Sequence, residues 1–244
     1  MAQTILLPNE FNIDNVNFLP PRKNNMGGQN VLLTYADGDA RPGPLVFQTP
    51  RMRLPFGFDK QESDNGQVKY NLNLSLGNGE ESSANLTMFT ENIRTLDEFM
   101  KDKSVEFAEK WFGKKMKKDV IEELYKSCEK KPKDTKWAST IKVKLPFRDS
   151  KPQFEAYDDK KKKIEVVDSD GNPSLDCFQK GSEVVCLIQC TGMWFIGKTQ
   201  FGIGWKVLQA KVYQTNKLVG YSIVDDDDDE EEPKETDDNE CDIE

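Results

Sequence analysis

Two segments of the sequence place aromatic rings beside basic side chains, and this combination is the first sign of chemistry in the chain. Residues 47–58 carry two arginines and three phenylalanines in a stretch broken by two prolines. Because the residue before a proline stays extended, such a stretch can remain open on a sheet edge, where guanidinium groups and rings reach phosphates and bases. The candidate binding residues are Arg51, Arg53, Phe56 and Phe58. The alternative is that Phe47 and Phe56 lie in the core and that both arginines are only solvated.

The second segment, residues 193–206, spans a predicted hairpin between two long strands. Side chains alternate between the two faces of a strand, so part of this set must point away from the core. Glycines within the segment allow a ligand or another backbone to approach closely. The candidates are Trp194, Lys198, Phe201, Trp205 and Lys206. For each ring, burial in the core is the alternative to contact with a base.

Residues 141–145 alternate aliphatic and lysine side chains. On a strand, this spacing puts the aliphatic side chains on one face and the lysines on the other. The pattern therefore predicts a strand with one core face and one cationic face, which adds Lys142 and Lys144 to the candidates.

Catalysis is the weakest class of function for this composition. The chain has no histidine among its 244 residues, which removes the commonest general base and the commonest metal ligand. Metal nucleases that depend on carboxylates can work without histidine, but no persuasive cluster of Asp and Glu precedes the C-terminal tail. The five cysteines lack the paired short spacings of zinc sites and disulfide frameworks. We expect no enzyme activity, no catalytic residue, no metal site and no cofactor.

The net charge of −9 is distributed very unevenly along the chain. Residues 225–244 hold fourteen carboxylates and one lysine, a local balance of −13. The remaining residues hold 33 basic and 29 acidic side chains, a balance of +4. The sequence therefore combines a mildly basic body with a strongly acidic tail.

The acidic tail is predicted to be disordered, because adjacent like charges repel and almost nothing apolar is available to bury. One interpretation is a solubilising appendage. The other is a segment that competes with nucleic acid for the basic body and docks partner proteins when the body is occupied. The residues assigned to such docking are Asp225, Asp226, Asp227, Asp228, Asp229, Glu230, Glu231 and Glu232, with Ile243 as a small apolar anchor.

The order of patterns along the chain predicts a mainly β fold with helices in the middle. Residues 1–30 carry prolines and glycines among asparagines and are predicted to form an extended N-terminal arm. Alternating strands follow, and a capping box at residues 95–98 begins a helical insertion that runs to about residue 131. Strands resume up to residue 224, which favours a small barrel or sandwich with an inserted helical cap.

The compartment can also be inferred from what the sequence contains. The first residues lack a basic region followed by an apolar stretch, and no apolar run approaches the ~18 residues that a membrane span requires. The odd number of cysteines favours a reducing environment. We expect an intracellular protein that is neither secreted nor inserted in a membrane.

In outline, this layout resembles the bacteriophage T7 type of single-stranded DNA-binding protein, which joins a basic, aromatic-bearing β-barrel and a helical cap to a carboxylate-rich tail. Residues 44–57, with the sequence Pro-Leu-Val-Phe-Gln-Thr-Pro-Arg-Met-Arg-Leu-Pro-Phe-Gly, further resemble the version of that family found in large nucleocytoplasmic DNA viruses of algae and protists. The phage-type tail ends in an aromatic residue, whereas this chain ends in Cys-Asp-Ile-Glu.

The resemblance implies an OB-fold-like antiparallel β-barrel that binds single-stranded DNA without strong sequence preference during replication and recombination. It also implies a homodimer whose tails mask the binding clefts and contact polymerase and helicase or primase. The expected location is a viral replication site in the host cytoplasm or nucleus.

The sequence thus predicts an arm over residues 1–30, a binding domain over 31–224 with an insertion at about 95–131, and a tail over 225–244. The function predicted is non-catalytic binding of single-stranded DNA. A structural or virion protein, or an acidic-tailed assembly protein that acts like a chaperone, is the alternative. Such a protein shares the tail but needs no exposed aromatic rings.

Overall fold

The computed structural model describes residues 4–23, 29–38, 41–62, 66–77, 83–134, 136–197 and 199–214. The predicted acidic tail and Lys198 lie outside these ranges. Within them the fold is mainly β, as the sequence predicts, with helices inserted between two groups of strands.

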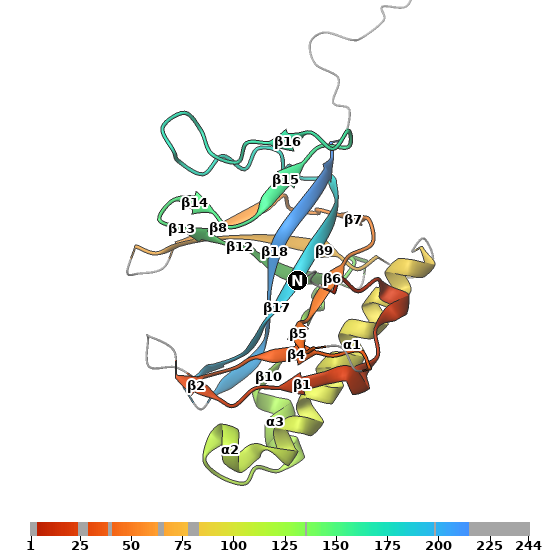
Figure 1. The fold of residues 1–244 in the computed structure, drawn as a ribbon, viewed down its shortest axis with the longest axis vertical. Coiled ribbons are helices and arrows are strands. Elements are labelled where there is room, and N and C mark those ends of the chain that lie inside the picture. The colour runs from red at the N-terminus through yellow and green to blue at the C-terminus, as the bar shows by residue number, and fades with distance from the viewer. Residues whose placement is uncertain are drawn as a thin grey trace, which may run out of the picture.

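A long hairpin crosses the whole molecule and carries most of the other strands (Figure 1). It consists of β17 (Glu183–Ile196) and β18 (Gln200–Tyr213), which are fourteen residues each and antiparallel. Along β17 every second residue from Val184 to Cys190 is buried, because side chains alternate between the two faces of a strand. Two register shifts interrupt the pairing, one beside Ile188 and one beside Gly192, and such bulges bend a strand while keeping its apolar side on the core.

The remaining strands extend this hairpin on both sides. The main path of the large sheet has the order β2-β3-β17-β18-β12-β9-β8, where the flanking strands are β2 (Arg22–Lys23), β3 (Gln29–Val31), β12 (Thr140–Leu145), β9 (Val68–Ser75) and β8 (Phe58–Glu62). Shorter members of the sheet are β6 (Val46–Gln48) and β7 (Met52–Arg53) on β17, β10 (Tyr125–Lys126) and β15 (Glu155–Tyr157) on β18, β11 (Glu129–Lys130) on β12, and β16 (Lys163–Ile164) on β15. Separate small sheets are formed by β1 (Val16–Phe18), β4 (Leu33–Tyr35) and β5 (Gly43–Pro44), and by β13 (Phe147–Arg148) and β14 (Lys151–Pro152).

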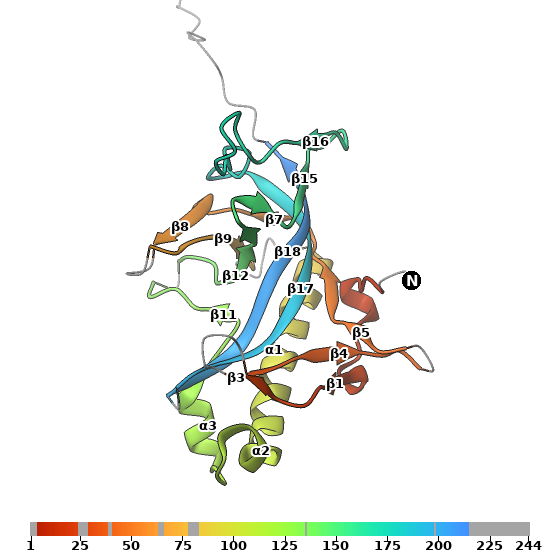
Figure 2. The ribbon, with the colours of Figure 1, turned by 60° about the vertical axis from the view of Figure 1, so that its left-hand side comes forward.

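The predicted closed barrel is not formed by the described residues. Closure requires an unbroken ladder of strand pairing around the axis. Among the described strands no pairing joins β8 to β2, so the sheet stays open. Helix α1 (Ala84–Glu106) runs alongside the sheet and contributes the apolar side chains that cover its inner side (Figure 2).

The helical insertion occupies residues 84–124 rather than the predicted 95–131. Ser83 caps α1, with its hydroxyl accepting a hydrogen bond from the Leu86 backbone at 3.2 Å. The capping box expected at residue 95 is therefore wrong, because that segment lies inside a longer helix. The shorter helices α2 (Ala108–Phe112) and α3 (Lys118–Leu124) follow, and the residues after them form β10 and β11.

The core lies between the inner side of the sheet and one face of α1. Buried side chains follow the helical spacing of an apolar stripe, namely Leu86, Phe89, Ile93, Leu96 and Met100. Phe47 is fully buried between this stripe and the sheet, with its ring centroid 5.9 Å from Phe89 and 5.8 Å from Trp205.

The described part of the predicted N-terminal arm packs against the body. It contains two 3-10 turns, Pro8–Glu10 and Ile13–Asn15, and strand β1, which pairs with β4. Leu6 forms a bridge with Phe47 and is buried, as is Val16. This segment therefore forms part of the core instead of a separate extended arm.

A buried carboxylate connects α1 to the strands that follow the insertion. Asp97 is only 3% exposed. It accepts hydrogen bonds from the Tyr125 hydroxyl at 2.5 Å, the Ser127 hydroxyl at 2.5 Å and the Cys128 backbone amide at 2.9 Å. Burial raises the pKa of the Tyr125 hydroxyl, so it keeps the proton that it donates.

An ion pair makes a second connection, between α1 and the hairpin of β11 and β12. The Arg94 guanidinium donates two hydrogen bonds to the Glu129 carboxylate, at 2.8 and 2.9 Å, and the Ser139 hydroxyl donates a third at 2.6 Å. A bidentate pair of this kind fixes both distance and orientation. Glu129 precedes the hairpin loop and Ser139 follows it, so both ends of that loop are held.

Replacing the buried carboxylate should destabilise the fold strongly. Asp97→Ala leaves three donors without an acceptor, and we expect the free energy of unfolding to fall by about 3 to 5 kcal/mol. Urea denaturation measures this change. The matched control is Asp102→Ala on the same helix, whose side chain is 65% exposed and should change stability by no more than about 0.5 kcal/mol. Equal losses in the two variants would contradict the assigned role of Asp97.

Acid should destabilise the protein in part through Glu129. Hydrogen bonds from Arg94 lower the pKa of this carboxyl from 4.5 to about 2. A lowered carboxyl pKa contributes stability that is present above pH 4.5 and is lost as the pH falls towards about 2. In Glu129→Gln we therefore expect a flatter dependence of the unfolding free energy on pH over this window, measured by urea denaturation. Glu106→Gln, at an exposed position on α1, should leave the wild-type slope in place.

Candidate nucleic-acid interface

The sheet face that points away from the core carries a group of lysines, which we call the lysine face. Across the strands, Lys206 lies opposite Lys144, and Lys144 lies opposite Asn71. Residues paired in this way share a face, and the intervening residues of β12 are buried on the other side. The same alternation and pairing add further lysines from β9, β10 and β11. The lysine face consists of Lys69, Lys126, Lys130, Lys142, Lys144 and Lys206.

Lys142 lies where positive charge is concentrated on this face. Its ammonium donates a hydrogen bond to Gln61 at 3.0 Å and lies 3.6 Å from the Asp59 carboxylate. Burial lowers the pKa of Lys142, and the nearby charge of Lys130 lowers it further, while Asp59 opposes both. A neighbouring positive charge repels the Lys142 ammonium, so a bound anion would be stabilised here.

Trp194 forms an aromatic platform next to the lysines. A Cβ atom at Gly202 would lie 3.0 Å from Cζ2 of Trp194, and one at Gly204 would lie 3.6 Å from Cδ1. The indole therefore extends over both glycines of β18, with one ring face against that strand. Trp194 remains partly exposed. This is the geometry on which an unpaired base can stack.

Two buried polar atoms on the same face have no hydrogen-bond partner among the described residues. They are Nδ2 of Asn71 and Oδ1 of Asn30. Asn71 lies opposite Lys144, and Asn30 lies opposite Trp194. Buried polar groups without a partner are uncommon and cost about 1–3 kcal/mol each. Both atoms lie beneath the surface that carries the lysines and the platform.

The structure divides the residues predicted to bind into separate groups. Lys142, Lys144, Lys206 and Trp194 share the lysine face. Arg51 and Arg53 lie at the far end of β17 instead, where Arg51 pairs with Glu183 at 2.5 Å and stacks 4.0 Å above the Tyr213 ring.

The two phenylalanines of the first predicted segment remain exposed. Phe56 is 68% exposed and Phe58 is 37% exposed. Phe58 lies opposite Leu72 on β9, so it points to the other side of the sheet from Asn71 and the lysines. The alternative that Phe56 lies in the core is therefore wrong, whereas for Phe47 the core assignment is correct.

Phe201 and Trp205 are not exposed platforms. Phe201 is 1% exposed and packs against Phe112, with ring centroids 5.0 Å apart. Trp205 is 4% exposed, and its indole N–H donates to the Cys128 sulfur at 3.3 Å. Both rings point to the side of β18 that the helices cover. The sequence pattern alone did not indicate which side of the hairpin the helices would occupy.

Other members of the lysine face escaped the sequence analysis. Lys69 belongs to a strand whose alternation was visible, but nothing in the sequence paired that strand with β12. Lys126 and Lys130 fell within the predicted helical insertion, so they had no strand face to share. Both lysines belong to strands because α3 ends at Leu124, before either of them.

Membrane-spanning helices and metal sites are absent from the described residues. None of the helices among them is long and apolar enough to cross a membrane. Within the same residues no group of three or more His, Cys, Asp or Glu side chains gathers as a metal site. The four described cysteines are buried and unpaired, and burial raises the pKa of Cys186 and of Cys190 to about 12.

Comparisons with known proteins give remote structural similarities and one family. No curated protein matches the sequence significantly. The single-stranded DNA-binding protein gp2.5 encoded by bacteriophage T7 is similar at 14% identity and a TM-score of 0.43, over 80% of this chain and 98% of that chain. The single-stranded DNA-binding protein from bacteriophage Enc34 is similar at 11% identity and a TM-score of 0.39, over 86% of this chain and 96% of that chain. The same Enc34 protein in complex with single-stranded DNA is similar at 13% identity and a TM-score of 0.39, over 83% and 98% of the two chains.

A family model covers the part of the chain that holds the helices and the long hairpin. It matches residues 75–225, which is more than half of the sequence. Five of the six lysines of the lysine face and the Trp194 platform lie within that range. The chain therefore belongs to the family of unknown function DUF5871.

Proposed function

We propose that the protein binds single-stranded DNA, without catalysis and largely independently of sequence, across the lysine face and Trp194. The observation that carries the proposal is the strand register, which aligns Lys206 with Lys144 on the face that bears the aromatic platform. Lysine ammonium groups attract phosphates, and an exposed ring face attracts unpaired bases. Strand register supports both kinds of contact on the same face of the sheet.

The chemistry of this surface favours single strands over duplexes. In a duplex the base faces are stacked on one another, so a ring on a protein surface cannot reach them. A single strand presents its phosphates and its base faces separately. Every base has an aromatic face, and lysine acts as a point charge on any phosphate, so neither contact selects a sequence.

The acidic tail fits this function as a competitor for the same surface. Residues 225–244 carry a balance of −13 beside a body of +4, so the tail is attracted to the lysine face in the absence of DNA. DNA would displace it, and the freed tail would dock replication proteins such as a polymerase or a helicase-primase. In a homodimer, each tail would mask the lysine face of the other copy. The role proposed for the protein is in DNA replication and recombination.

Binding and its control by the tail can be measured together. We expect a labelled single strand of ~30 nucleotides to bind more tightly than its duplex, in fluorescence anisotropy titrations at low and moderate salt. A variant truncated after Val224 should bind the single strand more tightly than the full chain, because the competing charge is removed. No binding by either form would reject the proposed function and leave a structural or assembly role. Unchanged affinity after truncation would reject the masking role alone.

Substitutions on the lysine face should change the salt dependence of binding. Removing two phosphate contacts with Lys144→Ala and Lys206→Ala together should reduce the slope of log K against log salt by about 2. The matched control is Lys60→Ala, because Lys60 lies opposite Tyr70 and points to the other side of the same sheet. Equal slopes for the double variant and the wild type would place the DNA elsewhere.

A further inference from the structure

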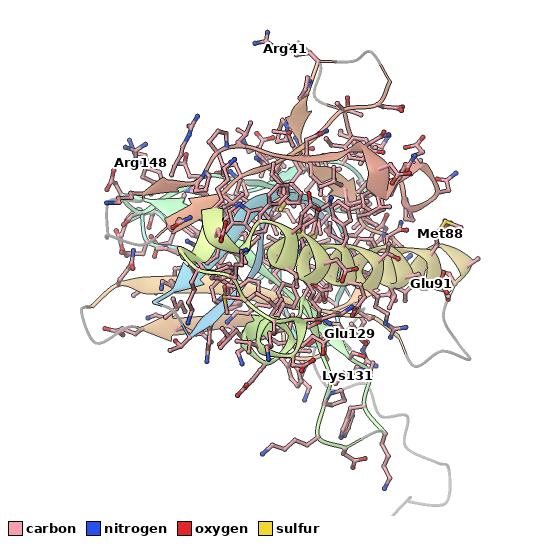
Figure 3. All side chains as sticks on the ribbon, turned by 90° about the horizontal axis from the view of Figure 1, so that it is seen from below. Arg41, Met88, Glu91, Glu129, Lys131 and Arg148 are labelled. Carbon is pink, nitrogen blue, oxygen red and sulfur yellow. The ribbon has the colours of Figure 1, made fainter. Side chains whose placement is uncertain are left out.

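A projecting hairpin adjoins the lysine face. Lys130 of β11 lies opposite Thr140 of β12, and the chain between them forms a loop that extends away from the body. Figure 3 labels Glu129 at the base of this hairpin and Lys131 at the start of its loop. The same loop stands clear of the sheet in Figure 2. We call the described residues of this hairpin, 130–134 and 136–139, the finger.

The finger presents an aromatic ring to solvent. Trp137 is 72% exposed, which is the highest value for any large hydrophobic side chain among the described residues. Its backbone amide donates to the Asp134 carbonyl at 3.2 Å, and the Lys136 amide donates to the Asp134 carboxylate at 3.0 Å. These bonds hold the backbone on either side of the exposed ring.

Positive charge is concentrated in the finger. The finger contains four lysines, and Asp134 is its one acidic residue. Its carboxylate is already used within the turn. Salt bridges to these lysines are absent among the described residues, so their charges remain available. They are Lys130, Lys131, Lys133 and Lys136.

The base of the finger is rigid. Glu129 on one side of the loop is held by two hydrogen bonds from Arg94, and Ser139 on the other side donates to the same carboxylate. A loop held at both ends loses less conformational freedom when it binds a ligand than a free loop does. The ring and the lysines are thus presented in advance of binding.

We propose that the finger is a second contact site for single-stranded nucleic acid, in which Trp137 stacks on one unpaired base and the finger lysines bind the neighbouring phosphates. The inference rests on the proposed function, because the same strand reaches both surfaces. Lys130 belongs to the finger and to the lysine face, where it lies opposite Thr140, two residues from Lys142 on the same strand. A strand that crosses the lysine face therefore continues onto the finger.

Two substitutions of the ring separate stacking from simple apolar contact. Trp137→Leu keeps an apolar side chain without an aromatic face, and Trp137→Phe keeps an aromatic face. In anisotropy titrations of the full chain with a ~30-nucleotide thymine strand, the leucine variant should bind about 5- to 150-fold more weakly, and the phenylalanine variant should recover most of the loss. Urea denaturation should give both variants the wild-type midpoint, because the ring is exposed.

A strand of the same length made of abasic sites provides the matched ligand. It keeps the phosphates but offers no base, so the wild type and Trp137→Leu should bind it equally. The leucine variant could bind the thymine strand as tightly as the wild type, while Lys144→Ala with Lys206→Ala weakens binding. This result would overturn the finger as a contact site and leave the proposed function intact. Equal losses on both strands would overturn stacking. Absence of any preference of the wild type for single strands over duplex would remove both proposals.

Discussion

The two-sidedness of the β17–β18 hairpin is the constraint on which the rest of this structure depends. Successive side chains of a strand point to opposite faces, and the two strands pair over fourteen residues each. One face of the hairpin receives α1 and buries Phe201 and Trp205. The other face then necessarily carries Trp194 and Lys206. Core and candidate interface are two sides of the same ladder of hydrogen bonds.

Buried polar contacts attach the helical insertion to this ladder. Asp97 joins α1 to the segment around Tyr125 and Cys128, and Cys128 in turn accepts a hydrogen bond from Trp205 of β18. The pair of Arg94 and Glu129 joins the same helix to the base of the finger. The insertion therefore covers the apolar side of the sheet and also orients a surface loop. The stability of the fold and the orientation of the finger both depend on α1.

The distribution of charge separates the polar surface into regions with different properties. On the lysine face the cations meet few carboxylates, and Asp59 is the one in contact with Lys142. At the far end of β17, by contrast, Arg51 is already paired with Glu183. A cation with a carboxylate partner gives up that partner when it binds phosphate, so the lysine face is the better anion site although both regions contain basic and aromatic residues.

The sequence by itself determined the local features of this protein: the mainly β class, the alternation that gives residues 141–145 a cationic face, and the opposed charges of body and tail. These depend on nearest neighbours and on composition, which a sequence displays directly. Only the tertiary structure decided which strands pair, and hence that Lys144 meets Lys206 and that Phe201 is buried. It also decided that Trp137 stands on a held loop. Strand register arises from contacts between residues far apart in the chain, and a single sequence carries no local pattern for it.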